Sequence, residues 1–270
     1  MRGVAMTSAN GVDLWVEQEG EGDDVLFISG LADEGACWVD QVAGLKDRYR
    51  LTTFDNRGVG RSSTPDGPFQ IVDFAADTVA LMDALGLERT HVVGSSMGGA
   101  IAQELALAHP NRVASIVLNG TWCRGDRFLH EIFRNWMWSA EKADSIRDFL
   151  VTVNLWCFSP RIWNEGTMDG WIDAAAASPY AQSVDAFCRS AQALIEHDSA
   201  DRIGAIGAPT LVTVGELDLA LPVRFSQELV QRIPSSRLIV IDDAGHQPFQ
   251  EVPEEYNRLL DEFWRSIGSA

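Results

Sequence analysis

A serine within a glycine-rich turn is the residue of this chain best suited to covalent chemistry. Ser96 stands in the segment VGSSMGG at residues 93–99, which contains the pattern Gly-x-Ser-x-Gly. The apolar run before it predicts a strand, and Ala100–Ala108 after it predicts a helix. The glycines are needed because larger side chains there would collide with the adjoining strand and helix. The register of this pattern selects Ser96, and not Ser95, as the nucleophile.

A serine hydroxyl is a weak nucleophile, so it needs a base that accepts its proton. The candidates are the five histidines, His91, His109, His130, His197 and His246. His246 ends the segment DDAGH, a loop that follows the last apolar strand, and this places it at the same sheet edge as Ser96. His91 points along a strand into the core, and His109 lies at a helix end before a proline. We therefore predict that His246 is the base.

The base in turn needs a carboxylate that fixes its tautomer and stabilises the imidazolium. Asp218 ends the segment GELD, which follows the predicted strand Thr210–Val214. The chain order serine, aspartate, histidine agrees with a nucleophile at a strand-to-helix turn. Glu216, Asp242 and Asp243 are the alternatives to Asp218.

Two backbone N–H groups are predicted to bind the oxyanion that forms when the serine attacks a carbonyl. One belongs to Met97, the residue after the nucleophile. The other comes from the loop Gly30–Ala32, where we select Leu31 because the preceding glycine lets the chain turn beneath the carbonyl.

Short apolar runs alternate with segments of helical spacing along most of the chain. This alternation covers Asp24–Leu118 and resumes over Thr210–Trp264. It predicts an α/β fold with a mostly parallel sheet flanked by helices. Between residues 124 and 207 the pattern becomes wholly helical. We therefore predict a core domain made of residues 1–123 and 208–270, with a helical cap, or lid, inserted at residues 124–207.

The predicted cap holds five of the nine tryptophans, Trp136, Trp138, Trp156, Trp163 and Trp171. An insertion between sheet strands lies over the carboxyl edge of the sheet, where open α/β sheets bind ligands. The tryptophans then form an apolar roof over a substrate pocket. The alternative is that a small helical layer needs large side chains to form its own core. The residues predicted to contact the substrate are Trp122, Trp136, Trp138, Trp156 and Trp163.

The charge balance excludes several classes of partner. There are 21 basic and 39 acidic residues, and the net charge is −18. Such a chain repels nucleic acid and anionic membranes, so a small-molecule substrate is expected. No leader pattern and no apolar run of about 20 residues is present, so we predict a cytoplasmic protein. No cysteine or histidine spacing predicts a metal site, and a homodimer is compatible with the sequence.

These residues give the chain a resemblance to the α/β-hydrolase superfamily over nearly its whole length. Residues 55–62, DNRGVGRS, resemble the family's D-x-R-G-x-G-x-S turn, and residues 244–246 match its terminal A-G-H. Ser29 stands where the family commonly has a histidine before the oxyanion loop. The chain most resembles the capped group of 3-oxoadipate enol-lactonases, small esterases and cofactor-free haloperoxidases. The resemblance implies an eight-stranded sheet, a helical cap and an acyl-serine mechanism without a cofactor.

The predicted function is hydrolysis of a carboxylic ester or lactone with an apolar or aromatic portion. Three alternatives stay open: cleavage of a carbon–carbon bond in a ring-fission product, peroxide-dependent acyl transfer, and ligand sensing by a receptor that keeps the fold. The cap arginines would either bind a substrate carboxylate or be solvated; they are Arg124, Arg127, Arg134 and Arg161.

Overall fold

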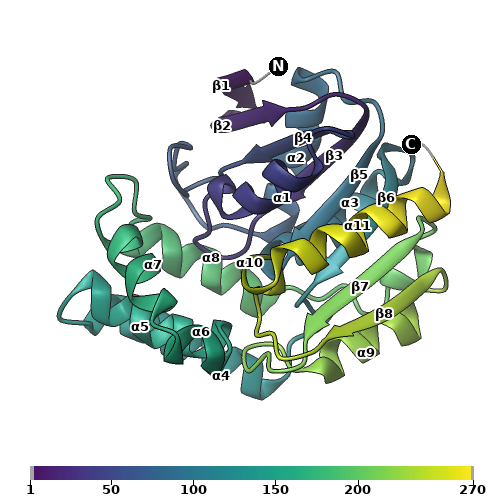
Figure 1. Ribbon diagram of the computed structural model, residues 1–270. Helices are drawn as coiled ribbons and strands as arrows, with labels where there is room; N and C mark the ends of the chain where they lie inside the picture. The colour runs from purple at the N-terminus through teal and green to yellow at the C-terminus, as the bar shows by residue number, and fades with distance from the viewer. Residues whose placement is uncertain (1–2, 269–270) are drawn as a thin grey trace.

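The computed structural model describes residues 3–268 and is built on an eight-stranded sheet with helices on both faces (Figure 1). The order of strands across the sheet is β1-β2-β4-β3-β5-β6-β7-β8. The pairs β1–β2 and β2–β4 are antiparallel, and the other neighbours are parallel. The predicted α/β fold with a mostly parallel sheet is confirmed. The strands are β1 (Gly3–Ala9), β2 (Val12–Glu19), β3 (Asp23–Ile28), β4 (Tyr49–Phe54), β5 (Thr90–Ser95), β6 (Val113–Asn119), β7 (Thr210–Gly215) and β8 (Ser236–Ile241).

Helices cover the two faces of the sheet in separate groups. One group is α1 (Val39–Leu45), α10 (Pro248–Glu251) and α11 (Pro253–Ile267), in which α1 packs against α11. The other is α2 (Ile71–Ala84), α3 (Met97–Ala108) and α9 (Val223–Arg232), in which α2 packs against α3. Three 3₁₀ turns complete the core: η1 (Gly35–Trp38), η2 (Pro110–Arg112) and η3 (Ile203–Ala205).

The central strands are apolar on both faces because both faces are covered. In β3, Leu26 and Ile28 join the apolar core on one side, while Val25 and Phe27 join the core on the other. All four side chains are fully buried. Successive side chains of a strand point to opposite faces, so a strand between two helix layers reads as a continuous apolar run. This is why the central strands could be predicted from sequence.

The hairpin β1–β2 was not predicted from sequence. Its turn is Asn10-Gly11, and both residues have positive φ, 50° and 76°. An Asn-Gly pair is a strong hairpin signal because it suits the turn that matches strand twist. The strand β1 is largely exposed at the sheet edge, so it lacks the apolar run by which the other strands were recognised.

Five helices lie between β6 and β7, where the sequence predicted a helical cap. They form a separate group beyond one end of the sheet, shown in teal and green in Figure 1. The division into domains at residues 124 and 207 remains a proposal. The helices are α4 (Arg127–Lys142), α5 (Ile146–Cys157), α6 (Pro160–Asn164), α7 (Thr167–Ala176) and α8 (Val184–Glu196).

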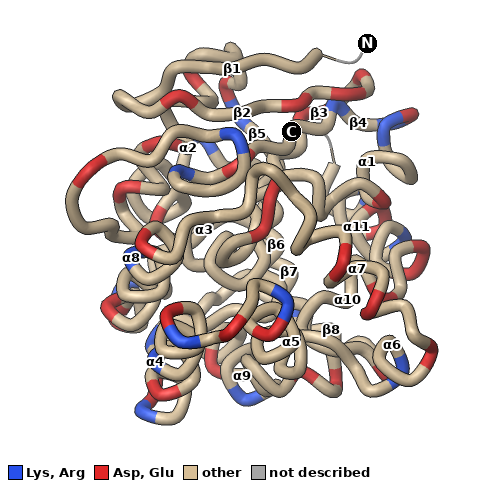
Figure 2. Tube along the Cα trace, turned by 90° about the vertical axis from the view of Figure 1, so that its left-hand side faces the viewer, with Lys and Arg blue, Asp and Glu red and all other residues tan. Residues whose placement is uncertain are grey.

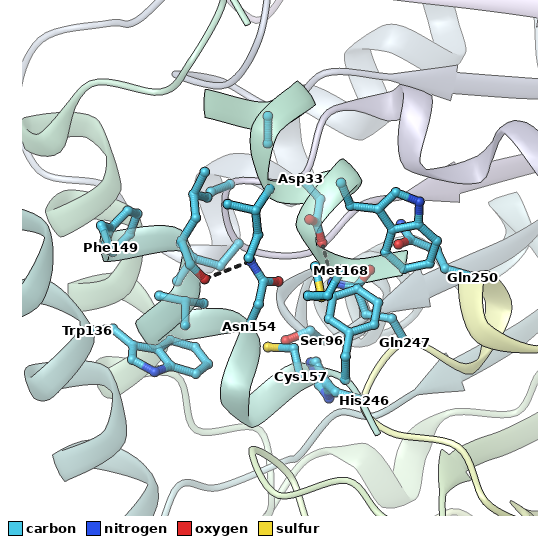
Figure 3. Close-up of a pocket in the computed structure, with 18 of the residues that line it drawn as sticks. Asp33, Ser96, Trp136, Phe149, Asn154, Cys157, Met168, His246, Gln247 and Gln250 are labelled. Carbon is cyan, nitrogen blue, oxygen red and sulfur yellow. Dashed lines mark hydrogen bonds between the residues drawn. The ribbon is translucent and has the colours of Figure 1, made fainter. Parts of the chain in front are cut away.

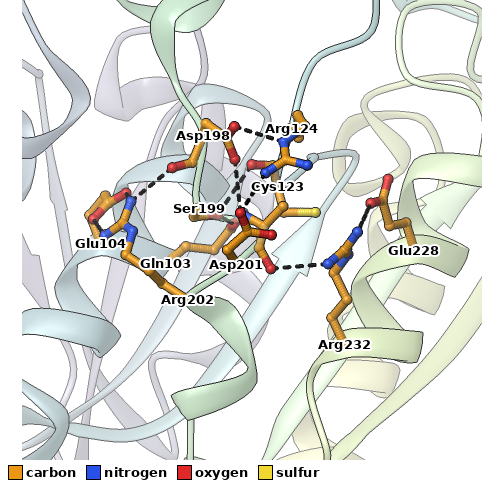
Figure 4. A network of polar contacts seen from close by, with 11 residues as sticks. Gln103, Glu104, Cys123, Arg124, Asp198, Ser199, Asp201, Arg202, Glu228 and Arg232 are labelled. Atoms are coloured by element: carbon orange, nitrogen blue, oxygen red, sulfur yellow. Dashed lines mark hydrogen bonds and ion pairs between the residues drawn. The ribbon is translucent and has the colours of Figure 1, made fainter.

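A polar network joins the two ends of this helical segment to each other and to the core (Figure 4). At one end, Arg124 forms ion pairs with Asp198, at 2.7 Å, and with Asp201, at 3.1 Å. Next to it, Arg202 donates two hydrogen bonds of 2.7 and 2.6 Å to the buried carboxylate of Glu104 on α3. The helix that begins beside Ser96 is therefore tied directly to the segment that follows α8.

Acidic residues are spread over many elements and do not gather on a single one (Figure 2). Within residues 3–268, no helix has the length and apolar character needed to cross a membrane.

We predict that Arg202→Met lowers the free energy of unfolding by about 1–2 kcal/mol, because Glu104 is left buried without its partner. The expected loss of stability is small because the Arg202 side chain is 52% exposed, so solvent screens its ion pair. The matched control is Arg134→Met, which removes an exposed ion pair with Glu131 on α4. Denaturant unfolding should show a loss for Arg202→Met and almost none for the control. Equal losses would contradict a special role for the buried pair.

Candidate active site

The backbone of Ser96 is held in an uncommon conformation between β5 and α3. Its φ and ψ are 54° and −115°, which is unfavourable for a residue with a side chain. Neighbouring hydrogen bonds hold it there: Ser96 N donates to Asn119 O at 2.9 Å, and Thr121 Oγ1 donates to Ser96 O at 2.8 Å. The serine is therefore fixed at the end of the strand, where its side chain lines a cavity.

The glycines of this turn are required by close backbone contacts. A Cβ atom on Gly94 would overlap the carbonyl oxygen of Gly98. A Cβ on Gly98 would overlap the carbonyl oxygen of Ile28 on the neighbouring strand β3. These contacts agree with the steric reason given for the Gly-x-Ser-x-Gly pattern.

His246 and Asp218 lie together at the carboxyl edge of the sheet. The Nδ1–H of His246 donates a hydrogen bond of 2.7 Å to Asp218 Oδ2, which leaves Nε2 as the proton acceptor. Asp218 Oδ1 accepts a second hydrogen bond from Leu221 N at 2.7 Å. Asp218 is buried, while its rivals Glu216 and Asp243 are exposed. Of these carboxylates, Asp218 is therefore the one positioned to orient the histidine.

The charges around His246 favour its protonated form. Burial by itself lowers the pKa of His246, but the carboxylates of Asp218 and, more weakly, Asp33 raise it above its ordinary value of 6.5. A base with a raised pKa becomes neutral, and hence active, only at a correspondingly higher pH.

The other histidines have structural surroundings. His91 is buried beside Ser115 and packs against the ring of Trp264, and burial lowers its pKa to about 4. His197 packs against Trp122. None of His91, His109, His130 and His197 is among the described residues that line the Ser96 cavity.

The cavity that Ser96 and His246 share has a volume of about 270 Å³ (Figure 3). Helices α4, α5, α7 and α8 supply most of its walls, and their contribution is mainly apolar. The apolar lining residues are Leu31, Ala32, Trp136, Phe149, Leu150, Val153, Phe158, Met168, Trp171, Ile172, Ala175 and Phe187. Polar groups come from Asp33, Asn154, Cys157, Gln247 and Gln250.

Only Trp136 of the five predicted substrate-binding tryptophans lines this cavity, and Trp171 lines it as well. The prediction for Trp138 is corrected, because this side chain is 62% exposed. Trp136 and Trp138 are two residues apart on α4, which places them about 200° apart around the helix. Trp138 therefore faces away from the site.

The remaining tryptophan predictions are also corrected. Trp122 is completely buried and packs against Phe133, with ring centroids 5.5 Å apart. Trp156 and Trp163 are partly buried against the apolar core and do not line the cavity. For Trp156 and Trp163, the alternative holds that a thin helical layer uses large side chains to form its own core, while Trp122 belongs to the apolar core after β6.

The loop after β3 carries Leu31 into the cavity beside Ser96. Ser29, which replaces the family's histidine, accepts a hydrogen bond of 3.1 Å from Trp38 Nε1, and its carbonyl accepts one of 3.2 Å from Asn56. Met97 begins α3, where the first amide groups lack an acceptor within the helix. The oxyanion roles of Met97 and Leu31 remain predictions, and Ser29 anchors the loop that holds Leu31.

The end of β6 supports the site in a way that sequence reasoning missed. Asn119 Nδ2 donates to the carbonyl of His246 at 3.3 Å and to Ser95 Oγ at 3.0 Å, so it links the nucleophile strand to the histidine loop. A Cβ on Gly120 would lie 2.9 Å from His246 Nδ1, so this position must be a glycine. The available signal was the Asn-Gly pair at the carboxyl end of a central strand.

The cap and the histidine loop are joined at Glu251. Its buried carboxylate accepts hydrogen bonds from Gly245 N, at 3.0 Å, and from Ser159 N, at 2.9 Å. In addition, His246 N donates to Cys157 O at the end of α5, at 2.8 Å. The position of the histidine therefore depends on helix α5 and on Glu251 as well as on the sheet.

The cap arginines do not reach the cavity. Arg124 and Arg134 are paired with carboxylates outside it, and Arg161 lies 3.7 Å from Glu251. Arg127 is exposed. Of the two alternatives for these residues, the structure favours solvated or paired side chains over carboxylate binding. No group of three or more His, Cys, Asp or Glu within residues 3–268 is arranged to hold a metal ion.

Comparison with known proteins identifies the class. A family profile described as alpha/beta hydrolase fold matches residues 24–147. A Mycobacterium tuberculosis protein provisionally named a non-heme bromoperoxidase is 34% identical over 267 residues, 95% of this chain and 99% of that protein. An Azorhizobium caulinodans protein provisionally named a carbamate hydrolase is 28% identical over 250 residues, 92% of this chain and 93% of the other.

A solved structure agrees with these relatives. Est816, described as an N-acyl homoserine lactone degrading enzyme, is 31% identical and superposes with a TM-score of 0.83, covering 95% of this chain and 99% of its own. The chain thus belongs to the α/β-hydrolase family, as its motifs predict. It is an enzyme of the hydrolase class.

We predict that Gly98→Ala destabilises the protein by roughly 1–3 kcal/mol and removes most of its activity, because the new methyl group must displace Ile28 or the turn at Ser96. The control is Gly170→Ala in α7, where a Cβ has no neighbour within 4 Å. That change should raise stability slightly, by about 0.5–1 kcal/mol, because alanine favours a helix. Thermal unfolding and turnover of a small activated ester test both variants. Normal turnover by Gly98→Ala would contradict the steric argument.

We predict that kcat/KM rises with pH through a pKa above 6.5, since His246 must be neutral to accept a proton and the neighbouring carboxylates raise its pKa. In Asp218→Asn the rise should move to lower pH, and kcat should fall by about 10³–10⁴ because the tautomer is no longer fixed. A pH–rate profile of both proteins makes the comparison. A rise at the same pH in both would show that Asp218 does not act on His246.

Proposed function

We propose that the protein is a serine hydrolase that cleaves a carboxylic ester or lactone through an acyl-serine intermediate. The observation that carries the proposal is the position of Ser96, whose backbone is strained and whose side chain lines the same cavity as His246. His246 is hydrogen-bonded to the buried Asp218. This arrangement contains the nucleophile, the base and the orienting acid that acyl transfer requires.

The reaction follows from the positions of these groups. The Nε2 atom of His246 accepts the hydroxyl proton as Ser96 Oγ attacks the substrate carbonyl. The N–H groups of Met97 and Leu31 bind the oxyanion of the tetrahedral intermediate. The imidazolium, stabilised by Asp218, then protonates the leaving alcohol. His246 next accepts a proton from a water molecule that attacks the acyl-serine carbonyl, and it returns this proton to Ser96 Oγ as the acid is released.

The cavity walls support an uncharged, largely apolar substrate portion. Trp136, Trp171 and Phe158 provide flat apolar surfaces, and residues 124–207 act as a lid over the carboxyl edge of the sheet. The described activity of Est816 on a lactone is consistent with this class. The relative named a carbamate hydrolase would act on a similar carbonyl group.

Peroxide-dependent acyl transfer is the second candidate, because a relative at 34% identity is named a bromoperoxidase. It would use the same acyl-serine, with peroxide instead of water as the acceptor. Carbon–carbon bond cleavage has weaker support, from a solved meta-cleavage product hydrolase that is 25% identical and superposes with a TM-score of 0.82. Ligand sensing stays an open alternative. Action as a homodimer and a location in the cytoplasm stay predictions.

We predict that Ser96→Ala reduces turnover of 4-nitrophenyl acetate by at least about 10⁴-fold, because the acyl-enzyme can no longer form. The control is Ser266→Ala on α11, which removes a hydroxyl outside the cavity and should keep most of the activity. Mass spectrometry of the wild-type protein during turnover should show the acyl adduct on Ser96. Undiminished turnover by Ser96→Ala would eliminate the proposed function.

A further inference from the structure

The mechanism leaves unused a carboxylate that lies in the active-site cavity. Asp33 follows the oxyanion loop, and its side chain lines the same cavity as Ser96 and His246 (Figure 3). A Cβ placed on Gly30 would lie 2.8 Å from Asp33 Oδ2 and 3.5 Å from Ser96 Cβ. The Asp33 carboxylate and the Ser96 side chain therefore both lie close to Gly30, at the place where a substrate carbonyl must bind.

No Lys or Arg is among the described residues that line this cavity. The titratable groups that face Asp33 from the surrounding elements are His246, Cys37 on η1 and Cys157 on α5. Burial, with a contribution from nearby carboxylates, raises the pKa of both thiols, so they carry no charge. When His246 is neutral and ready to act as base, the charge of Asp33 is not compensated by any of these groups.

Asp33 also keeps capacity to accept hydrogen bonds. Its one side-chain hydrogen bond among the described residues comes from Gln247 Nε2, at a long 3.5 Å. A carboxylate offers about four acceptor sites. A donor on a bound molecule can therefore approach it.

We infer that Asp33 is a specificity-determining residue that rejects substrates with a carboxylate near the scissile carbonyl and accepts uncharged substrates with an N–H or O–H donor there. This inference rests on the proposed function and names the substrate class of the same site. It is supported by the position of the cap arginines, which do not reach the cavity to offset a substrate charge.

The size of the effect follows from the distances involved. Two like charges about 6 Å apart at an effective dielectric constant near 20 repel enough to change binding by about 10- to 100-fold. The same carboxylate strengthens a hydrogen bond from an uncharged donor, because charge-assisted bonds are stronger than neutral ones.

Three ethyl esters of matched size test the selectivity. Monoethyl succinate carries a carboxylate, ethyl succinamate replaces it with an amide, and ethyl levulinate replaces it with a ketone that has no donor. For the wild type we expect kcat/KM to be highest for the amide and lowest for the carboxylate. In Asp33→Asn, the ratio of carboxylate to ketone should rise at least about 10-fold, and the ratio of amide to ketone should fall.

The matched control is Glu34→Gln. It removes the same charge one residue further along, from a side chain that lines an adjoining cavity and not the one containing Ser96. Its substrate ratios should stay within about twofold of the wild type, since the Glu34 carboxylate lies in the adjoining cavity beside Ser178, and not beside Ser96. Unchanged ratios in Asp33→Asn, or an equal change in Glu34→Gln, would overturn the inference.

A pH series on the wild type tests the same charge without a variant that must fold. Burial raises the pKa of Asp33 to about 6, and His246 and Gln247 oppose this shift. As the pH falls through 6, Asp33 becomes protonated while the substrate carboxylate stays ionised, so discrimination against monoethyl succinate should weaken. Protonation of His246 removes the base for both substrates equally, so its effect cancels in the ratio of their kcat/KM values. A ratio independent of pH between 5 and 8 would contradict a role for the Asp33 charge.

A binding measurement separates failure of this inference from failure of the proposed function. Quenching of tryptophan fluorescence, with Trp136 and Trp171 in the cavity, reports binding of butyramide and butyrate without turnover. Asp33→Asn should bind butyrate about 10-fold more tightly relative to butyramide than the wild type does. If no ester is hydrolysed but this shift occurs, the proposed function fails and the selectivity of the site stands. Equal relative affinities in the two proteins would refute the selectivity by itself.

Discussion

Ser96 keeps its uncommon backbone conformation at the sharp turn between β5 and α3. The chain packs so closely there that no side chain fits at position 94 or at position 98. Gly94 and Gly98 fill the gap between the strand, the helix and β3, while Asn119 and Thr121 hold the Ser96 backbone by hydrogen bonds. The strain is stored locally and is maintained by the fully buried parallel sheet. The cavity, the base and the oxyanion loop are all arranged around this fixed point.

The histidine loop depends on contacts from four parts of the chain. Asn119 holds it from the sheet, Asp218 from the loop after β7, Glu251 from α10, and Cys157 from the end of α5. A helical segment that only covered the site would not need such bonds. Because the cap shares hydrogen bonds with the loop of His246, a shift of α5 alters the position of the base as well as the shape of the cavity.

Electrostatics act at two scales in this molecule. The net charge of −18 disfavours anionic partners at long range, although salt screens this effect beyond about 8–10 Å. Inside the cavity, Asp33 places a negative charge close to the substrate, and the apolar walls limit the screening of this charge by water. The carboxylate raises the pKa of His246 and lies beside the path of the substrate. Both scales favour substrates without negative charge.

The sequence by itself determined the parallel sheet and proposed Ser96, Asp218 and His246. Buried strands appear in the sequence as apolar runs, and the carboxyl ends of parallel strands must meet at one edge of the sheet. Spacing and chain order were therefore sufficient to predict that these residues lie together. The exposed strand β1 left no such pattern. Only the tertiary structure decided which tryptophans face the cavity. It also decided that Asp33 lies in the cavity. A tryptophan packs equally well in a core or in a pocket wall, and a loop aspartate is usually solvated, so only the packing of the cap over the sheet assigns their surroundings.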